Sequence, residues 1–249
     1  MRETRNLSKK RDLRETHIPI CENNALEIAI DSTPFSFRTQ RRRRNVRRRK
    51  IYPNYSNAML PFVSVLCPTH NRHALLPIVI EQYQIQSYPI ERRELIILDD
   101  STDRANLHIS DKSINYIHHR TRLKIGKKRN MLLRQAKGEI VVWVDDDDLY
   151  NKDRILRSVN VLVSRDDVEV IGVKSTVFYD VNSRRFSKVT HTSKNYTCNN
   201  IMAHRKSIDC EYADEDAIGE EKVFTSGFQL NAYQFDGLDL CIHMCHSKY

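Results

Sequence analysis

The sequence has no long hydrophobic run. No stretch of its 249 residues approaches the roughly 20 apolar residues that a membrane-spanning helix needs. We therefore expect a soluble protein, or one attached only to the surface of a membrane. The length fits one domain of ordinary size plus a substantial additional segment. A hydrophobic content of 40% is sufficient to build a buried core.

Cysteine pairs at metal-binding or redox spacing are also missing. No two cysteines form a C-x-x-C pair or a zinc-finger pattern, and no secretory signal precedes them. We therefore expect a cytoplasmic protein whose cysteines are reduced thiols that mostly fill the core. The six cysteines are Cys21, Cys67, Cys198, Cys210, Cys241 and Cys245.

Residues 61–249 lack a net charge, although the whole chain carries a formal net charge of +9. Residues 1–60 contain 15 Lys and Arg against 6 Asp and Glu, whereas residues 61–249 contain 26 of each sign. The basicity culminates at residues 41–50 in an arginine block that repels itself, so we expect residues 1–60 to be largely disordered. A solvated tail, contact with an anionic membrane surface, a nuclear address and non-specific nucleic-acid binding are all compatible with this block.

After residue 60, short β-branched runs alternate with amphipathic stretches. Strands are predicted at residues 62–67, 95–98, 114–118, 140–144 and 168–173, with weaker signals up to 189 and at 201–204. Helices are predicted at 75–86, at 127–135 with Gly138 ending the helix, at 155–163, and from an acidic start around 214–224. This alternation implies a Rossmann-like α/β domain over residues 61–249, with a mostly parallel sheet covered by helices on both faces.

Four consecutive carboxylates, Asp145 to Asp148, follow the clearest of these strands. The sheet should bring them to its carboxyl edge, where open α/β folds bind ligands. Four adjacent like charges repel one another unless a cation or solvent relieves them, and hard oxygen ligands suit Mg²⁺ or Mn²⁺. The alternative is that one or two of them only begin the next helix. Helix capping accounts for one aspartate but not for four.

Asp99 and Asp100 follow another apolar strand, so they should lie near the acidic run, because successive parallel strands end at the same edge. A carboxylate there can accept hydrogen bonds from a base N–H or a ribose hydroxyl. The alternative is an ordinary Asx turn.

Two further charged segments are candidates for the same site. Lys127, Lys128 and Arg129 open a helix, where cationic side chains and free N–H groups can bind a diphosphate. Glu220 and Glu221 form a late pair of carboxylates, and a carboxylate that faces an acceptor hydroxyl can take its proton. Taken alone, the first is also compatible with a solvated face and the second with surface charge.

Together these motifs resemble glycosyltransferase family 2 over about residues 61–230. Residues 63–72 (VSVLCPTHNR) look like the opening strand and turn of the family. Residues 96–103 (IILDDSTD) are similar to its nucleotide-binding strand, without the glycine that usually follows the aspartate pair. Residues 126–130 (GKKRN) and 142–148 (VWVDDDD) match its arginine–asparagine helix and its D-x-D strand in order and spacing.

The resemblance implies a GT-A fold and a metal-dependent, inverting transfer of a sugar from a nucleotide-diphosphate sugar. A UDP-sugar is the expected donor, a glycan, lipid or protein is the acceptor, and Mn²⁺ or Mg²⁺ is the cofactor. The residues that it implies for binding the nucleotide-sugar are Pro68, Thr69, Asn71, Asp99, Asp100, Lys127, Arg129, Asp145 and Asp146.

The resemblance also implies metal ligands and a base. Asp145 and Asp147 would form the D-x-D pair, and the implied metal ligands are Asp147, Asp148 and His246, with His243 as a second late histidine. The catalytic base of the family, usually part of a Glu-Asp pair, falls at Gly219-Glu220-Glu221. Glu221 is therefore the first candidate for the base and Glu220 the second.

Two other functions are open at this point. A sugar nucleotidyltransferase has a similar sheet, but it usually carries a glycine-rich loop after the first strand, and residues 67–71 contain no glycine. The second is a protein that binds nucleic acid or a membrane surface through the arginine block and has a degenerate transferase domain. Deletion of residues 1–60 would abolish nucleic-acid binding and leave donor hydrolysis intact if the chain is an enzyme.

Overall fold

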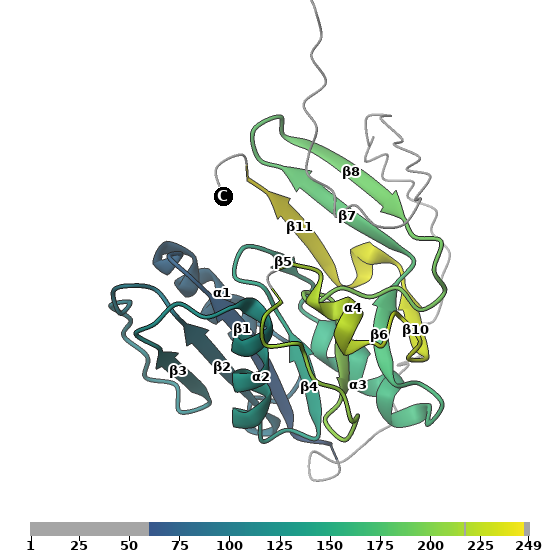
Figure 1. The fold of residues 1–249 in the computed structure, drawn as a ribbon, viewed down its shortest axis with the longest axis horizontal. Coiled ribbons are helices and arrows are strands. Elements are labelled where there is room, and N and C mark those ends of the chain that lie inside the picture. Colours follow the sequence, from purple (N-terminus) through teal and green to yellow (C-terminus); the bar gives the residue numbers. More distant parts are fainter. Residues whose placement is uncertain (1–59, 217, 247–249) are drawn as a thin grey trace, which may run out of the picture.

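The computed structural model describes residues 60–216 and 218–246, organised around two β-sheets (Figure 1). The arginine block and nearly all of the predicted basic segment lie outside the described residues, so the proposed division of the chain at residue 60 stays a prediction.

The main sheet has seven strands and is mostly parallel, as predicted. Only β9 runs against its neighbours, β4 and β6. The spatial order is β10 (Ala232–Phe235), β6 (Val170–Val173), β9 (Ala203–Arg205), β4 (Ile140–Trp143), β1 (Val63–Thr69), β2 (Arg93–Asp99) and β3 (Ile114–His118).

Helices cover both faces of this sheet. Successive side chains along a strand point to opposite faces, so each strand contributes to two separate cores. Val65 of β1 belongs to the core that holds α1 (Leu76–Gln84) and α3 (Arg154–Ser164). Its neighbour Leu66 belongs to the core that holds α2 (Ile125–Gln135) and α4 (Glu220–Phe224) (Figure 1). Short 3-10 helices lie at His73–Leu75, Ile90–Arg92 and Gly237–Asp239.

The second sheet has four strands and stands beside the carboxyl edge of the main sheet (Figure 1). Its order is β5 (Leu149–Tyr150), β11 (Cys241–Cys245), β7 (Ser175–Asp180) and β8 (Arg185–Thr190). Strand β5 directly follows the acidic run and pairs with β11 in antiparallel fashion. The sheet therefore flanks the segment where the sequence predicts a metal site.

The role predicted for Gly138 and the predicted start of the acidic helix were wrong. Helix α2 ends at Gln135, as predicted, but Ala136 is its C-cap, so Gly138 does not end it. A Cβ atom at Gly138 would lie 2.4 Å from the backbone nitrogen of Ser64, so glycine is needed there for close approach to β1. The acidic helix begins only at Glu220, because Gly219 before it has a left-handed φ of 69° that an α-helix does not contain.

The described cysteines are free thiols, and Cys67 and Cys241 are buried, as predicted. Within the described ranges, no helix is both long enough and apolar enough to cross a lipid bilayer.

Candidate active site at the carboxyl edge of the main sheet

A cleft of about 650 Å³ opens at the carboxyl ends of β1 and β4. Three segments far apart in the sequence form it, and its volume is typical of a pocket for a small ligand. Thr69 and Asp99 are paired in the register of β1 and β2, which brings the predicted groups to one edge. The lining residues are Pro68, Thr69, His70, Asn71 and Arg72, then Arg122, Ile125, Lys128 and Arg129, and finally Asp145, Asp146 and Asp147.

The acidic turn after β4 presents its carboxylates alternately to the cleft and to the protein interior. The side chains of Asp145 and Asp147 are 34% and 19% exposed, whereas that of Asp146 is 3% exposed. Asp146 accepts hydrogen bonds from Thr69 Oγ1 at 2.5 Å and from Arg72 Nη1 at 2.6 Å. Asp145 and Asp147 are therefore the two carboxylates of the turn most open to a ligand.

The protonation of this turn reflects competition between burial and Arg72. Burial raises the pKa of both Asp146 and Asp147, and the charges of neighbouring aspartates add to this rise. The guanidinium of Arg72, 2.8 Å from Asp147 Oδ2, opposes it. A cation bound at this point would relieve the repulsion between the carboxylates.

Asp148 points away from the cleft, toward the second sheet. It accepts a hydrogen bond from the backbone nitrogen of Met244 in β11 at 3.0 Å, and Asn200 also donates to it. Burial, and after it the charge of Asp145, raises the pKa of Asp148 to about 7. His243 lies 3.7 Å from Asp148, and His246 follows β11 and is not among the residues that line the cleft.

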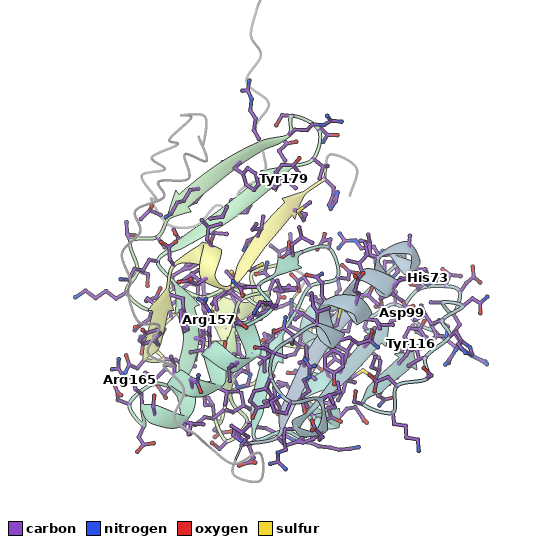
Figure 2. The ribbon with its side chains drawn as sticks, turned by 180° about the vertical axis from the view of Figure 1, so that it is seen from behind. His73, Asp99, Tyr116, Arg157, Arg165 and Tyr179 are labelled. Atoms are coloured by element: carbon purple, nitrogen blue, oxygen red, sulfur yellow. The ribbon has the colours of Figure 1, made fainter. Side chains whose placement is uncertain are left out.

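Asp99 is enclosed by protein groups (Figure 2). It accepts hydrogen bonds from the Ser101 backbone nitrogen at 2.9 Å and from the Tyr116 hydroxyl at 2.6 Å, and His73 Nε2 lies 3.2 Å away. Burial would raise the pKa of this carboxyl, but the bonds from Ser101 and Tyr116 outweigh it and lower the pKa. Asp99 therefore stabilises the loop after β2.

Asp100 anchors a buried lysine that borders the cleft. Lys128 Nζ lies 2.5 Å from Asp100 Oδ1 and 2.8 Å from the carbonyl oxygen of Thr69. Asp100 also accepts from the backbone nitrogen of Leu123. Lys127, which the sequence singled out for the diphosphate, is exposed and does not line the cleft.

Arg129 connects the cleft to the acidic helix. Its Nη2 lies 3.3 Å from Asp145 Oδ1, and its Nε donates to Glu220 Oε1 at 2.8 Å. The guanidinium is buried over the ring of Trp143, with 4.9 Å between its central carbon and the ring centroid. The sequence did not predict that the acidic turn and the acidic helix lie close together. In the structure, both contact the side chain of Arg129.

Glu220 and Glu221 differ in environment. Glu220 is buried and bonded to both Arg129 and Asn199. Glu221 is partly exposed and accepts from Asn199 Nδ2 at 3.2 Å. Burial raises the pKa of Glu221, and the charge of Glu220 contributes further. Glu221 is thus the better placed of the two to receive a proton.

Sequence reasoning missed two residues that contact these groups: Arg72 and Asn199. Lys128 was named with its neighbours for the diphosphate, and its burial follows from its place four residues before Leu132, on the buried face of the helix. Arg72 belongs to the opening motif but was not recognised as a partner of the acidic run. Asn199 lies in a segment without periodicity, and no local pattern marks it.

The sheet, the cleft at its edge and the acidic turn define a GT-A fold, and solved structures agree. One match is a fragment of Staphylococcus aureus TarS in complex with UDP, with a TM-score of 0.60 and 22% identity over 74% of this chain and 60% of that chain. Another is the mannosyltransferase PcManGT from Pyrobaculum calidifontis with GDP-Man and Mn²⁺, with a TM-score of 0.57 and 18% identity over 78% and 59%. At these identities the likeness shows the fold alone.

The chain belongs to glycosyltransferase family 2, since the model of that family matches residues 64–216. It is 27% identical over 195 residues to the poly(ribitol-phosphate) beta-N-acetylglucosaminyltransferase TarS of S. aureus strain Mu50, covering 68% of this chain and 32% of TarS. It is also 27% identical to an uncharacterized glycosyltransferase of Haemophilus influenzae, covering 54% of this chain and 55% of that protein. The chain thus spans about a third of TarS and about half of the second relative.

Proposed function

We propose that this chain transfers a sugar from a UDP-sugar to a hydroxyl group of a glycan, lipid or protein acceptor, with inversion at the anomeric carbon. The observation that carries the proposal is the position of Arg129, which bonds to Asp145 in the cleft and to Glu220 beside Glu221. A donor cleft with a carboxylate base at its border is what an in-line displacement requires. The UDP and UDP-GlcNAc found in TarS structures support a uridine nucleotide as donor.

The diphosphate of the donor would bind to the cationic side of the cleft. Arg72, Arg122 and Lys128 line it. Arg129 Nη1 is buried and has no hydrogen-bond partner among the described residues. A buried donor without a partner costs about 1–3 kcal/mol, so a phosphate oxygen that accepts from Nη1 is favoured there. Arg129 would then stabilise the charge that develops on the departing diphosphate.

The nucleoside would lie against the loop after β1, formed by Pro68, Thr69 and Asn71. Asp100 accepts hydrogen bonds from His70, Leu123 and Lys128. The side chains of Asp99 and Asp100 are both fully buried, and neither lines the cleft. Base recognition by either carboxylate therefore stays a prediction.

Glu221 is the proposed base, with Glu220 as the second candidate. Glu221 would take the proton from the acceptor hydroxyl while the acceptor oxygen bonds to the anomeric carbon. The bond from that carbon to the diphosphate oxygen breaks, and UDP leaves with the electron pair. A pKa raised by burial makes Glu221 a stronger base than an exposed glutamate.

A divalent ion, Mn²⁺ or Mg²⁺, fits the acidic turn. No group of three or more His, Cys, Asp or Glu in the described part of the chain forms a complete metal site. Such ions often bind to one or two carboxylates together with substrate phosphates, which suits Asp145 and Asp147. When bound, the ion would stabilise negative charge on the diphosphate. Asp148 and His246 stay predictions as further ligands.

The test is release of UDP or GDP from a panel of nucleotide-sugars in the presence of Mn²⁺. We expect one donor to be turned over by the wild-type protein. Asp147→Ala should abolish nucleotide release, and Glu221→Gln should lower transfer to an acceptor by about 10²–10⁴-fold, which is the usual contribution of a general base.

Matched controls are Asp166→Ala and Glu215→Gln, since both residues are exposed. Their activity should equal that of the wild type. Release of pyrophosphate from a nucleoside triphosphate and a sugar phosphate would instead identify a nucleotidyltransferase. Absence of binding to every nucleotide-sugar would contradict both enzymatic readings.

A further inference from the structure

The side-chain amide of Asn199 lies between the two carboxylates of α4. Its Nδ2 donates to Glu220 Oε1 at 3.0 Å and to Glu221 Oε2 at 3.2 Å. We propose that Asn199 is a positioning residue, which holds the carboxylate of the catalytic base Glu221 in one orientation beside Glu220. This rests on the proposed function, because it assumes that Glu221 receives the proton of the acceptor.

The orientation of the Asn199 amide is itself determined. Its Oδ1 accepts a hydrogen bond from the Tyr212 hydroxyl at 2.7 Å, and both residues are buried. Because the hydroxyl occupies the amide oxygen, the NH₂ group must face the carboxylates. The flipped amide would place its oxygen against two carboxylates, which is electrostatically unfavourable. The contacts therefore select one rotamer and one direction of donation.

Tyr212 is held from several sides, so the hydroxyl that orients Asn199 is fixed. Its ring stacks on Phe224 of α4 with centroids 4.5 Å apart and meets the edge of Trp143 at 5.6 Å. Its backbone is clamped by Asn130, whose Nδ2 donates to the Tyr212 carbonyl at 2.7 Å and whose Oδ1 accepts from the Tyr212 nitrogen at 3.0 Å. Helix α2 thus supports the base through Asn130 as well as through Arg129.

Asn199 has a particular importance for Glu221 because the two glutamates are not equally supported. Glu220 has the guanidinium of Arg129 at 2.8 Å. Glu221 forms no ion pair with any described residue, and the Asn199 amide is its closest side-chain donor there. A neutral donor holds the carboxylate in place without quenching its negative charge, which leaves Glu221 able to accept a proton.

The environment of Glu221 gives a readout that is specific to positioning. The charged and titratable groups that face it are Glu220 on its own helix, Arg129 and Asp145 from the cleft, and Tyr196, Cys198 and Tyr212. Replacing the amide by a third carboxylate adds negative charge next to Glu221. The acid limb of the pH–rate profile should then move to higher pH, whereas a change that only loosens packing would not move it.

The experiment compares Asn199→Asp with the wild-type full-length chain. The aspartate has the same shape and can still accept from Tyr212, but in its ionised form it cannot donate to Glu221. With the UDP-sugar that the wild type turns over, we expect kcat to fall by about 10–100-fold, part of what a complete general base contributes. The KM for the donor should stay within about twofold, since the cleft is intact.

A second variant and a control distinguish loss of positioning from loss of folding. Tyr212→Phe removes only the hydroxyl that orients the amide, and we expect a kcat loss of about 3–10-fold with the same donor KM. Asn182→Asp makes the same chemical change at an exposed residue and should leave kcat and the pH profile as in the wild type.

The two proposals fail in different ways. A wild-type chain that releases no UDP from any donor contradicts the proposed function, and the role of Asn199 falls with it. A wild-type chain that is active, with wild-type kcat and pH profile in both Asn199→Asp and Tyr212→Phe, refutes the positioning role alone. A donor KM raised as strongly as kcat is lowered would also refute it, since it would place the effect in the donor cleft.

Discussion

Arg72 Nη1 lies 2.6 Å from Asp146 Oδ1, and this contact joins the loop after β1 to the acidic turn after β4. The same nitrogen lies 2.8 Å from Asp147 Oδ2. One guanidinium thus neutralises two neighbouring carboxylates, of which one is buried and one faces the cleft. A bound metal ion, like Arg72, would neutralise the negative charge of these carboxylates. Removing the arginine should therefore increase the stabilisation that the ion gives to the folded protein.

In Arg72→Ala the buried Asp146 keeps Thr69 as its one side-chain partner among the described residues, and we expect the free energy of unfolding to fall by about 1–3 kcal/mol. Mn²⁺ should raise the melting temperature of this variant by more than that of the wild type. Thermal unfolding with and without Mn²⁺ measures both effects. Arg120→Ala, at an exposed residue, is the control. Equal Mn²⁺ stabilisation of variant and wild type would show that the ion does not act at this turn.

Arg129→Met should be strongly destabilising, because Glu220 would be left buried with Asn199 as its remaining side-chain partner in the described part of the chain. Breaking one half of a buried ion pair costs about 3–5 kcal/mol. The double variant Arg129→Met with Glu220→Gln should recover part of this loss, since no uncompensated charge remains at position 220. Urea denaturation gives the three free energies. Additive losses in the double variant would mean that the two side chains are not energetically coupled.

The pH dependence of transfer should report the raised pKa of Glu221. Activity should fall as the pH drops through a value above that of an ordinary glutamate, because the protonated carboxyl cannot accept a proton. A carboxyl with a raised pKa in the folded state stabilises the protein only at low pH and loses this contribution as the pH rises. Glu221→Gln should therefore show the loss of about 10²–10⁴-fold in transfer given above and yet be more stable than the wild type near neutral pH, as measured by thermal unfolding.

His204 should make the fold sensitive to acid. Burial lowers the pKa of His204 to about 4, whereas the unfolded chain takes up this proton near pH 6.5. The contribution of neutral His204 to the free energy of unfolding is therefore fully present above pH 6.5. It is lost as the pH falls toward 4, by up to about 1.4 kcal/mol per pH unit. His204→Gln should reduce this slope in denaturation at several pH values. His108→Gln, at an exposed residue, should leave it unchanged.

The periodic elements could be predicted from the sequence because burial on one face leaves a local signal. Ile155, Val159 and Leu162 recur at helical spacing, and all three are buried in α3. Strands β5, β10 and β11 were not predicted, because each is short and is stabilised by partners far away in the chain. The pairing of β11 with β7 and β5 is a tertiary event that no window of neighbouring residues contains.

The same distinction applies to the candidate site. The acidic turn and the Glu220–Glu221 pair were visible in the sequence as runs of adjacent carboxylates, whose negative charges repel one another. Their connection through Arg129 was not visible, because Asp145 and Glu220 are brought together only by the packing of α2 and α4 on one face of the sheet. Asn199 was missed for the same reason, since its partners are close to it in the folded structure but not in the sequence.

The contact between Asp148 and the backbone of Met244 spans 96 residues of sequence. During synthesis the acidic turn leaves the ribosome long before β11, so the carboxylate of Asp148 stays without this partner until nearly one hundred more residues have been added. Contacts between distant residues form late and slow the folding of a chain. The turn at the centre of the cleft is therefore among the last parts of the molecule to be completed, and an interrupted chain that lacks β11 would carry an acidic turn without its final support.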